Sequence, residues 1–421
     1  MPEQPIPFGP QMEPNSDPIV GAPPLAVNAI WDGAGFRRRR GLGVYDGAPS
    51  TAIASTAIQG LHLTANGHLL AVDSTPTARN IYDVTPGGAD SLTQADGTGA
   101  LRGDGRPVFA ETEAIVAIAG GEGIVKVILG TQPLEASLLG GTQASATHVL
   151  ANNARLLANN LTVRNRINYS DLAAGSSYAG HEDWTTIGAA GYIASDARAD
   201  YVNALLDSTN EVMAFGRRSA QSFSADSVQI FASVATKDFG CSAPYSAIRF
   251  DDGIGWLDHK RRIVLSDGRG IRVASGPIQE ELDTMASVED CYAFELYQRL
   301  LAWKFSDGRT FVLDRERDTW SLWMGWNAET NNFTAWAGTA TCIRDDSGVS
   351  VVGTNDGKIL KLERRSVSDN GTDIVMDLRT GFVTRGSALR KWCKHVRFMF
   401  HGGDDADGHA LVSWRDGFSA W

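Results

Sequence analysis

The sequence predicts an all-β fold, a β-propeller built from repeated antiparallel hairpins, and three observations support this prediction. Glycine accounts for 45 of the 421 residues, well above the ~7% of an average protein, and glycine supplies the positive φ angles that tight turns need. Short apolar strands alternate with polar or glycine-containing turns along most of the chain. Helical periodicity is confined to a short stretch near residues 278–285.

The hairpin pattern is clearest in four segments, which begin at Val212, Gly255, Leu301 and Val351. The last two contain Asp-Gly, a dipeptide that tight hairpin turns prefer. We place hairpin turns near residues 77, 122, 160, 216, 261, 308, 357 and 408. Their average spacing of about 47 residues lies in the range of propeller blades, whereas a β-sandwich needs no such regular period. The spacing therefore predicts about seven or eight repeats.

The repeat also predicts which aromatic residues are equivalent. A shift of 47 residues places Trp256 on Trp303 and Val264 on Phe311. Because a hairpin buries only one face and must stack on its neighbours, we expect both tryptophans to be buried between adjacent blades.

Residues 1–42 are predicted to form an extended proline-rich arm with a basic block, and residues 43–421 the propeller. Eight of the fifteen prolines fall within residues 1–24, where fixed φ angles and missing N–H donors exclude helix and inner strand. Such an arm lies on a neighbouring subunit or is disordered.

The overall charge limits the possible partners. Lys and Arg number 38 and Asp and Glu number 49, which gives a net charge of −11. A chain of this charge is not expected to bind nucleic acid in general, because phosphates would repel it. No membrane span and no secretory leader are expected, since the most apolar stretch is too short and carries Glu122 and Lys126. Four cysteines without a CxxC pair indicate a reducing compartment during assembly.

Motifs for catalysis, cofactors and metals are not convincing. Residues 175–180 lack the spacing of a nucleophile elbow, and residues 353–359 lack that of a phosphate-binding loop. The 401–409 loop contains Asp404, Asp405 and Asp407, which could offer oxygens to Ca²⁺, but a solvated turn is the favoured interpretation. We therefore predict no enzymatic activity, no cofactor and no metal.

Two basic clusters are the candidate assembly contacts. Four adjacent arginines repel one another unless an acidic group lies near, and the second cluster contains no acid between residues 378 and 400. A solvated face is the simpler alternative, and contact with a charged partner or a neighbouring subunit is the functional one. The candidates are Arg37, Arg38, Arg39, Arg40, Arg390, Lys391, Lys394 and Arg397.

An ordered series of short motifs resembles the tail hub or tail nozzle proteins of short-tailed phages, also called packaged-DNA stabilisation proteins. The series covers most of the chain. It consists of AVNAI (26–30) with RRGL (39–42), RINYSDL (166–172) with Trp184, EVMAFGRRSAQSF (211–223), GCSAPYS (240–246), GWLD (255–258), SGPIQEEL (275–282) and TFVLD (310–314) with Thr319 and Trp320. The segment from Asp314 to Trp320 is also similar to the Asp-box turn of sialidase-like propellers, with Asp318 at the usual glycine.

The resemblance implies a structural virion protein without an active site. Its protomer would be a β-propeller in a hexameric ring below the portal and head-tail adaptor, with tail fibre or spike and plug proteins as further partners. The ring would hold the packaged genome and let double-stranded DNA leave without sequence-specific binding, which an acidic wall suits. The implied location is the phage tail, assembled in the host cytoplasm.

Two alternatives belong to other classes. The first is a carbohydrate-binding or glycan-processing propeller, for which the eleven tryptophans would line pockets. Glycan hydrolysis would require two carboxylates about 5 to 9.5 Å apart. The second is a general interaction propeller, which would not assemble into rings.

Overall fold

The computed structural model describes residues 26–378 apart from short segments. The segments left out within this range are 32–35, 49–50, 55, 76–78, 86–87, 93–100, 132, 142–144, 174–176, 187–189, 209–210, 227–229, 252, 268–269, 298, 345–347, 365 and 367. The described residues form one unit, Leu25–Asp377. The basic cluster at residues 390–397, the 401–409 loop and the proline-rich segment 1–24 lie outside the described residues.

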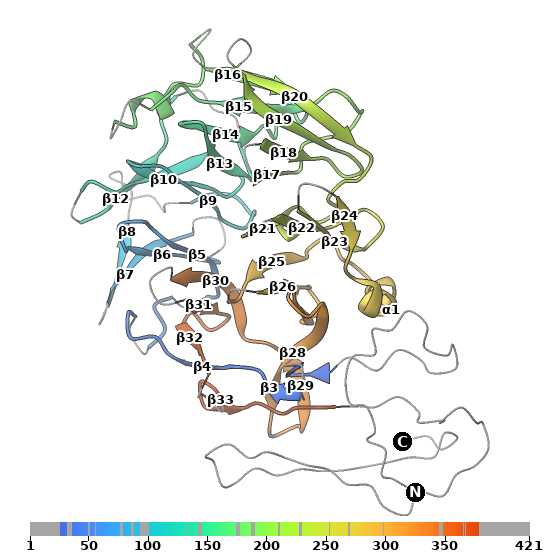
Figure 1. Ribbon diagram of the computed structural model, residues 1–421. Helices are drawn as coiled ribbons and strands as arrows, with labels where there is room; N and C mark the ends of the chain where they lie inside the picture. The colour runs from blue at the N-terminus through green and yellow to red at the C-terminus, as the bar shows by residue number, and fades with distance from the viewer. Residues whose placement is uncertain are drawn as a thin grey trace, which may run out of the picture. The chain divides into compact units, whose positions relative to one another are not determined.

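Seven sheets of four antiparallel strands each follow one another along this unit (Figure 1). We number them blades 1 to 7. In blades 1 to 6 the four strands lie side by side in the order in which they occur in the sequence. The predicted fold class is confirmed, because the chain is all-β and forms a propeller of seven blades.

The strand bounds of the first four blades are as follows. Blade 1 contains β5 (Ile58–Leu63), β6 (Leu69–Asp73), β7 (Ile81–Thr85) and β8 (Gly88–Leu92). Blade 2 contains β9 (Val108–Glu111), β10 (Ile115–Ala119), β11 (Ile124–Ile128) and β12 (Glu135–Leu138). Blade 3 contains β13 (Val149–Asn152), β14 (Arg155–Asn159), β15 (Arg166–Tyr169) and β16 (Gly191–Ala194). Blade 4 contains β17 (Ala204–Ser208), β18 (Glu211–Phe215), β19 (Ala220–Asp226) and β20 (Ile230–Lys237).

The remaining blades include strands from both ends of the described chain. Blade 5 contains β21 (Ile248–Phe250), β22 (Gly253–Leu257), β23 (Ile263–Ser266) and β24 (Ile271–Val273). Blade 6 contains β25 (Tyr292–Glu295), β26 (Leu300–Lys304), β27 (Thr310–Asp314) and β28 (Thr319–Asn327), with β29 (Asn332–Ala335) paired to β28. Blade 7 contains β30 (Gly338–Arg344), β31 (Val349–Thr354), β32 (Ile359–Glu363) and β4 (Gly41–Val44).

The ring is closed by the N-terminal part of the chain. Strand β4 pairs antiparallel with β32, so one strand from the beginning of the described chain completes a blade made by its end. Strand β1 (Ala26–Val27) adds to β28 of blade 6 in parallel, and β2 (Ala29–Trp31) pairs with β3 (Phe36–Arg38). Beyond β4, the short strands β33 (Ser368–Asp369) and β34 (Thr372–Asp373) extend blade 7.

This closure corrects the predicted domain boundary at residue 43. The described strands between residues 26 and 44 are not part of an arm: β1 and β4 belong to blades 6 and 7, and β2 and β3 pair with each other. The prediction placed these residues in the arm because their strands are short and because β1 and β4 pair with β28 and β32, which lie far away in the sequence. A strand that pairs only with a distant segment has no hairpin turn in the local sequence to identify it.

The predicted turns correspond to one position in the repeat. The turns near residues 77, 122, 160, 216, 261, 308 and 357 each connect the second and third strands of a blade, from blade 1 to blade 7 in order. The eighth, near residue 408, lies outside the described residues. In the two Asp-Gly turns the glycines Gly308 and Gly357 have φ angles of 92° and 77°, which glycine adopts without the strain of a side chain.

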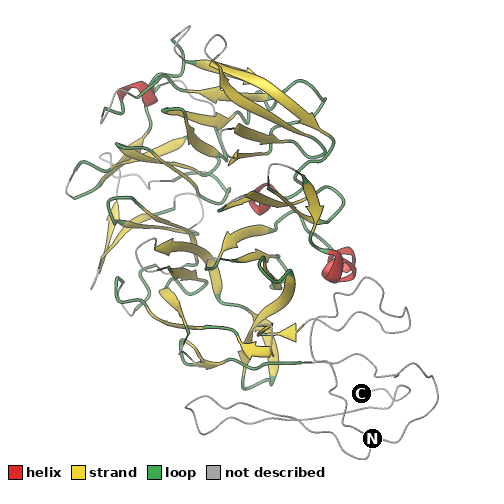
Figure 2. Ribbon diagram, in the orientation of Figure 1, coloured by secondary structure: helices red, strands yellow, loops and turns green. Residues whose placement is uncertain are grey.

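Helix is scarce in the described chain (Figure 2). The one α-helix, α1 (Gln279–Thr284), falls within the predicted helical stretch. The 3-10 helices are η1 (Ala179–Glu182), η2 (Pro244–Ser246) and η3 (Gly276–Ile278). None of these helices in the described part of the chain is long or apolar enough to span a lipid bilayer.

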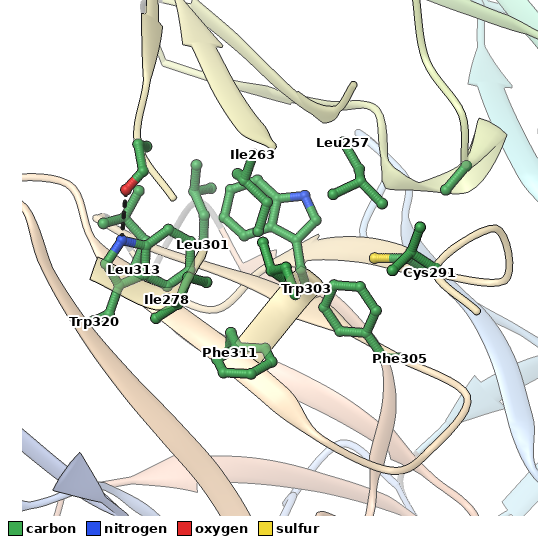
Figure 3. Close-up of a cluster of buried hydrophobic side chains, with 14 of the residues drawn as sticks. Leu257, Ile263, Ile278, Cys291, Leu301, Trp303, Phe305, Phe311, Leu313 and Trp320 are labelled. Carbon is green, nitrogen blue, oxygen red and sulfur yellow. Dashed lines mark hydrogen bonds between the residues drawn. The ribbon is translucent and has the colours of Figure 1, made fainter. Parts of the chain in front are cut away.

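Packing between blades confirms the predicted equivalence of the two tryptophans. Trp256 in β22 pairs with Val264 in β23, and Trp303 in β26 pairs with Phe311 in β27, so both occupy the same position in successive blades. Both are fully buried. Trp303 lies in a cluster shared by blades 5 and 6, beside Leu257 (Figure 3).

The Asp-box-like segment forms the turn between β27 and β28. The carboxylate of Asp314 accepts backbone N–H groups of Glu316 at 3.1 Å and Arg317 at 3.3 Å. Asp318 has a φ angle of 52°, which explains why glycine suits this position in the motif that the segment resembles. Trp320 packs into the same core and donates from Nε1 to the carbonyl of Ala274 at 2.8 Å, the dashed line in Figure 3.

Candidate functional site: the closure seam and the propeller axis

The predicted basic block lies where the propeller closes, and its four arginines have different environments. Arg39 is only 1% exposed. Its guanidinium forms a two-pronged ion pair with the carboxylate of Asp369, with Nη1 and Oδ1 2.9 Å apart. Nε donates to Oδ1 of Asn28 at 2.8 Å. The guanidinium also lies 5.3 Å from the ring centre of Trp323.

Arg39 is therefore not an assembly contact, and this prediction was wrong. An acidic group near the arginines was expected to come from a partner, but for Arg39 it is Asp369 of the same chain, 330 positions away. An arginine with its charge neutralised and its side chain buried between blades holds the fold together and cannot reach another subunit.

The other three arginines remain accessible. Arg37 is exposed, whereas Arg38 and Arg40 are partly buried. The guanidinium of Arg40 lies over the ring of Tyr297, 3.8 Å from its centre. No hydrogen bond from these three side chains and no ion pair is found among the described residues. We call Arg37, Arg38 and Arg40 the seam arginines.

Both ends of the described chain also meet at this seam. Val27 and Asp377 exchange backbone hydrogen bonds of 2.9 and 3.3 Å. Asn28 links the two ends to blade 6, because its side chain donates to the carbonyl of Val375 at 2.8 Å and accepts the N–H of Met324 at 2.8 Å. The two ends of the described propeller chain, near residues 27 and 377, are thus paired with each other beside the seam arginines.

A second cluster, which the sequence did not reveal, lies at the propeller axis. The first strands of neighbouring blades contact one another and are the innermost strands. At the end of the axis where these strands begin, side chains from different blades meet. We call this the axial cluster; its members are Arg79 (blade 1), Arg106 (before β9), His148 (before β13), Tyr245 (in η2), and Tyr292 and Lys304 (blade 6).

Arg106 connects four blades in this cluster. Its Nη2 donates to the carbonyls of Gln59 in blade 1, at 2.8 Å, and Thr339 in blade 7, at 2.5 Å. Its guanidinium lies 3.5 Å from the ring centre of Tyr292 in blade 6. Burial lowers the pKa of Arg106 below its usual value, while the neighbouring tyrosines Tyr292 and Tyr245 oppose this shift.

The other two cations of the axial cluster also donate to carbonyls. Lys304 donates from Nζ to Trp336 O at 2.6 Å and Gly338 O at 2.8 Å, and burial lowers its pKa to about 8. Arg79 donates to carbonyls that include Gly120 O at 2.8 Å. Among the described residues neither these two nor Arg106 forms an ion pair with a carboxylate. The axial cluster therefore contains two buried cations, Arg79 and Lys304, and the partly buried Arg106, none of which has a carboxylate in direct contact among the described residues.

The aromatic members of the axial cluster lie beside these cations at the same end of the axis. The ring of Tyr245 stacks on the imidazole of His148, with 5.1 Å between their centres. Burial lowers the pKa of His148 to about 4, so the imidazole is neutral at neutral pH. Burial also raises the pKa of Tyr245. Because Tyr245 precedes β21 of blade 5 and interacts with Arg79, Arg106 and His148, side chains from blades 1, 2, 3 and 5 meet at this end of the axis.

Carboxylates lie toward the opposite ends of the innermost strands. Glu295, at the end of β25, shares Arg315 with Asp251; Arg315 Nη2 is 2.9 Å from Asp251 Oδ2 and 3.9 Å from Glu295 Oε1. Burial, with a smaller contribution from Asp251, raises the pKa of Glu295. The arginine between them makes this an ion-pair network, which differs from the open pair of carboxylates that the glycan-processing alternative requires.

The motifs rejected in the sequence have structural roles where they are described. Residues 353–359 form the β31–β32 turn, in which Thr354 Oγ1 accepts the N–H of Lys358 at 3.0 Å. Cys241 and Cys291 are buried thiols. Within the described ranges no group of three or more His, Cys, Asp or Glu side chains could hold a metal ion. The 401–409 loop lies outside these ranges, so a solvated turn without Ca²⁺ stays a prediction for this loop.

Comparison with known proteins gives structural matches only. No family model matches the chain, and no curated protein matches it. One similar solved structure is the WD40 β-propeller domain of Doa1, with a TM-score of 0.47 and 10% identity over 78% of this chain and 98% of that one. Another is the computationally designed Ika8 protein, with a TM-score of 0.42 and 11% identity over 77% of this chain and 99% of that one.

Proposed function

We propose that this chain is a structural subunit of a phage tail, a tail hub or nozzle protein that assembles into a ring around the path of the exiting genome. The observation that carries the proposal is the closure seam. Arg37, Arg38 and Arg40 have no carboxylate partner among the described residues, Arg40 contacts the ring of Tyr297, and the three lie beside the paired ends of the described chain. Accessible charges without a carboxylate partner are suited to contacts between subunits.

The motifs that resemble this family are distributed over successive blades. Residues 166–172 include β15 of blade 3, and residues 211–223 contain the central turn of blade 4. Residues 255–257 lie in β22 of blade 5 and Asp258 follows it, and residues 310–314 are β27 of blade 6. The series therefore follows the blade framework and is not confined to one loop.

The axial cluster constrains where DNA would pass. Side chains from several blades meet at one end of the propeller axis, and in this proposal the duplex does not pass along that axis. In the proposed hexameric ring the conduit lies between the copies, on their outer surfaces. The net charge of −11 suits a wall along which phosphates slide, because few counterions would be released on contact.

The proposal includes the absence of catalysis and a defined set of partners. The portal and the head-tail adaptor would bind above the ring, and tail fibre or spike and plug proteins would bind elsewhere. Activity against a panel of polysaccharides that is abolished by one Asp or Glu substitution would contradict the structural role.

The oligomeric state of the purified full-length chain tests the proposal. We expect rings in negative-stain images and a ring mass by light scattering. The double substitution Arg37→Ala and Arg38→Ala should shift the protein toward monomer, since it removes two unpaired charges while leaving Arg39 and Asp369 in place. Deletion of residues 1–24 should also weaken the rings.

The matched control is Arg102→Ala with Arg198→Ala, two exposed arginines outside the seam. This control should leave the ring mass and the melting temperature unchanged. A wild-type chain that stays monomeric at all concentrations, also in the presence of its portal, would overturn the proposal.

A further inference from the structure

A polar hollow of about 430 Å³ lies between the central turns of blades 4 and 5 and the connection to blade 6. Its wall consists of Arg217, Arg218, Ser242, His259, Arg261, Ala286, Ser287, Val288 and Glu289. Hollows of this size accommodate small molecules. It is separate from the seam arginines, and the proposed function makes no use of it.

The first wall is the turn between β18 and β19, which presents two arginines. Asp200 holds this turn, because its Oδ2 accepts the N–H groups of Arg218 at 2.7 Å and Ser219 at 3.0 Å. Burial raises the pKa of Asp200, but the backbone donors outweigh burial and lower it overall. The carboxylate is thus engaged by the backbone, and the guanidinium of exposed Arg218 has no partner among the described residues.

The second wall is the turn between β22 and β23, which is also held by hydrogen bonds to a carboxylate. Asp258 accepts the N–H groups of Lys260 at 2.8 Å and Arg262 at 2.9 Å. Arg261 reaches across to the segment after α1 and donates to the carbonyl of Met285 at 2.7 Å. His259 lines the hollow, and neither ring nitrogen has a hydrogen-bond partner among the described residues.

The charges around the hollow favour an anion. Glu289 is the one acidic residue of the wall, and it is paired with Arg217 at 2.5 Å. Arg218 and Arg261 lack a carboxylate partner among the described residues, and so does exposed Lys260 beside them. Two acids of these turns are already engaged: Asp200 by backbone N–H groups, and Asp258 by backbone N–H groups and the guanidinium of Arg262.

We propose that this hollow binds the phosphate group of a small phosphorylated molecule or free inorganic phosphate. The guanidinium group matches the oxygens of phosphate with its planar fork of donors. The imidazole of His259 and the hydroxyl of Ser287 are further polar groups of the wall. Donors on three separate loops suit a tetrahedral oxyanion, which offers acceptor oxygens in several directions, better than a planar carboxylate.

Calorimetric titration at constant ionic strength tests this site. The probes are sodium phosphate and glucose 6-phosphate, with glucose as the uncharged comparator. We expect saturable binding of one or both phosphate probes and none of glucose. Binding of sodium phosphate alone would identify the free ion as the ligand, and preference for glucose 6-phosphate would identify a phosphate ester.

The diagnostic variant is Arg218→Ala, because this side chain is exposed and its loss should not affect folding. Loss of a charged hydrogen bond predicts at least about a tenfold weaker affinity, and Arg218→Lys should restore part of it. Arg102→Ala is the matched control and should bind like wild type. Absence of saturable binding to both phosphate probes, or equal affinity of wild type and Arg218→Ala, would overturn the proposal. Ring assembly is measured separately, so failure here leaves the proposed function standing.

Discussion

The closure seam and the axial cluster each contain an arginine that contacts several blades, buried Arg39 and partly buried Arg106, but the groups around the two charges differ. Arg39 at the seam has a carboxylate partner, Asp369, in two-pronged contact. Arg106 at the axis has only carbonyl oxygens and the face of Tyr292. Carbonyls and an aromatic face supply hydrogen bonds and a favourable field without neutralising the charge.

The difference shows in which region a buried charge depends on a single charged partner. At the seam, removal of either charge leaves the other buried and uncompensated. At the axis, the positive charges are spread over Arg79, Arg106 and Lys304, and the burial cost appears as lowered pKa values. We therefore expect the seam to be sensitive to substitution and the axial cluster to be sensitive to pH.

The largest effect is expected for Asp369→Ala. This change leaves the guanidinium of Arg39 buried without a counter-charge, which costs about 3 to 5 kcal/mol of unfolding free energy. Denaturant titration measures the loss. The double variant Arg39→Met with Asp369→Leu should recover most of it, because no charge remains buried.

An exposed ion pair provides the control for that experiment. Arg198 and Asp238 are 2.7 Å apart but largely exposed, so Asp238→Ala should have a much smaller effect than Asp369→Ala. Equal losses for the two alanine variants would show that burial of the seam pair has no energetic consequence.

The second effect concerns acid stability and His148. Its pKa in the folded chain is about 4 and its ordinary value is 6.5, so between these values the unfolded chain binds a proton that the folded chain does not. Stability therefore falls as the pH drops from 6.5 to 4, by about 3 kcal/mol at 1.36 kcal/mol per pKa unit. Thermal unfolding across this range measures the slope.

His148→Gln isolates this contribution. Burial also lowers the pKa of His181, so wild type and variant should share that smaller part of the slope and differ only by the His148 part. A variant that loses stability as steeply as wild type between pH 6.5 and 4 would contradict the assignment.

The smallest effect is expected for Arg40→Ala. Its guanidinium lies over Tyr297 and is partly exposed, and such contacts contribute about 0.5 to 1 kcal/mol. The melting temperature should fall slightly, and Arg40→Lys should retain much of the contact. A fall as large as that of Asp369→Ala would mean that Arg40, too, is part of the buried network.

The sequence predicted the repeat because the determinants of a hairpin are local. Each of the seven described turns could be located from the polar or glycine residues between two apolar strands, and the equivalence of Trp256 and Trp303 followed from the period. A hairpin can be recognised from about a dozen consecutive residues, because an apolar strand and the turn residues that follow it are adjacent in the sequence. The same local pattern predicted α1 and the Asp-box-like turn.

The candidate sites were less predictable for the same reason. The sequence located the basic block at residues 37–40, but it could not separate buried Arg39 from the three accessible arginines, since they differ only in their distant neighbours. The members of the axial cluster occur singly, on different blades, and no spacing connects Arg106 with Tyr292 or Tyr245 with His148.

The sequence by itself thus determined that the chain is all-β, where its central hairpins turn and which tryptophans stack between blades, because these features depend on neighbours within one repeat. Tertiary structure alone decided that seven blades close the ring, that β4 completes blade 7 and that Asp369 neutralises Arg39. Closure brings together residues more than 300 positions apart, and the cost of burying a charge depends on what the folded ring places beside it.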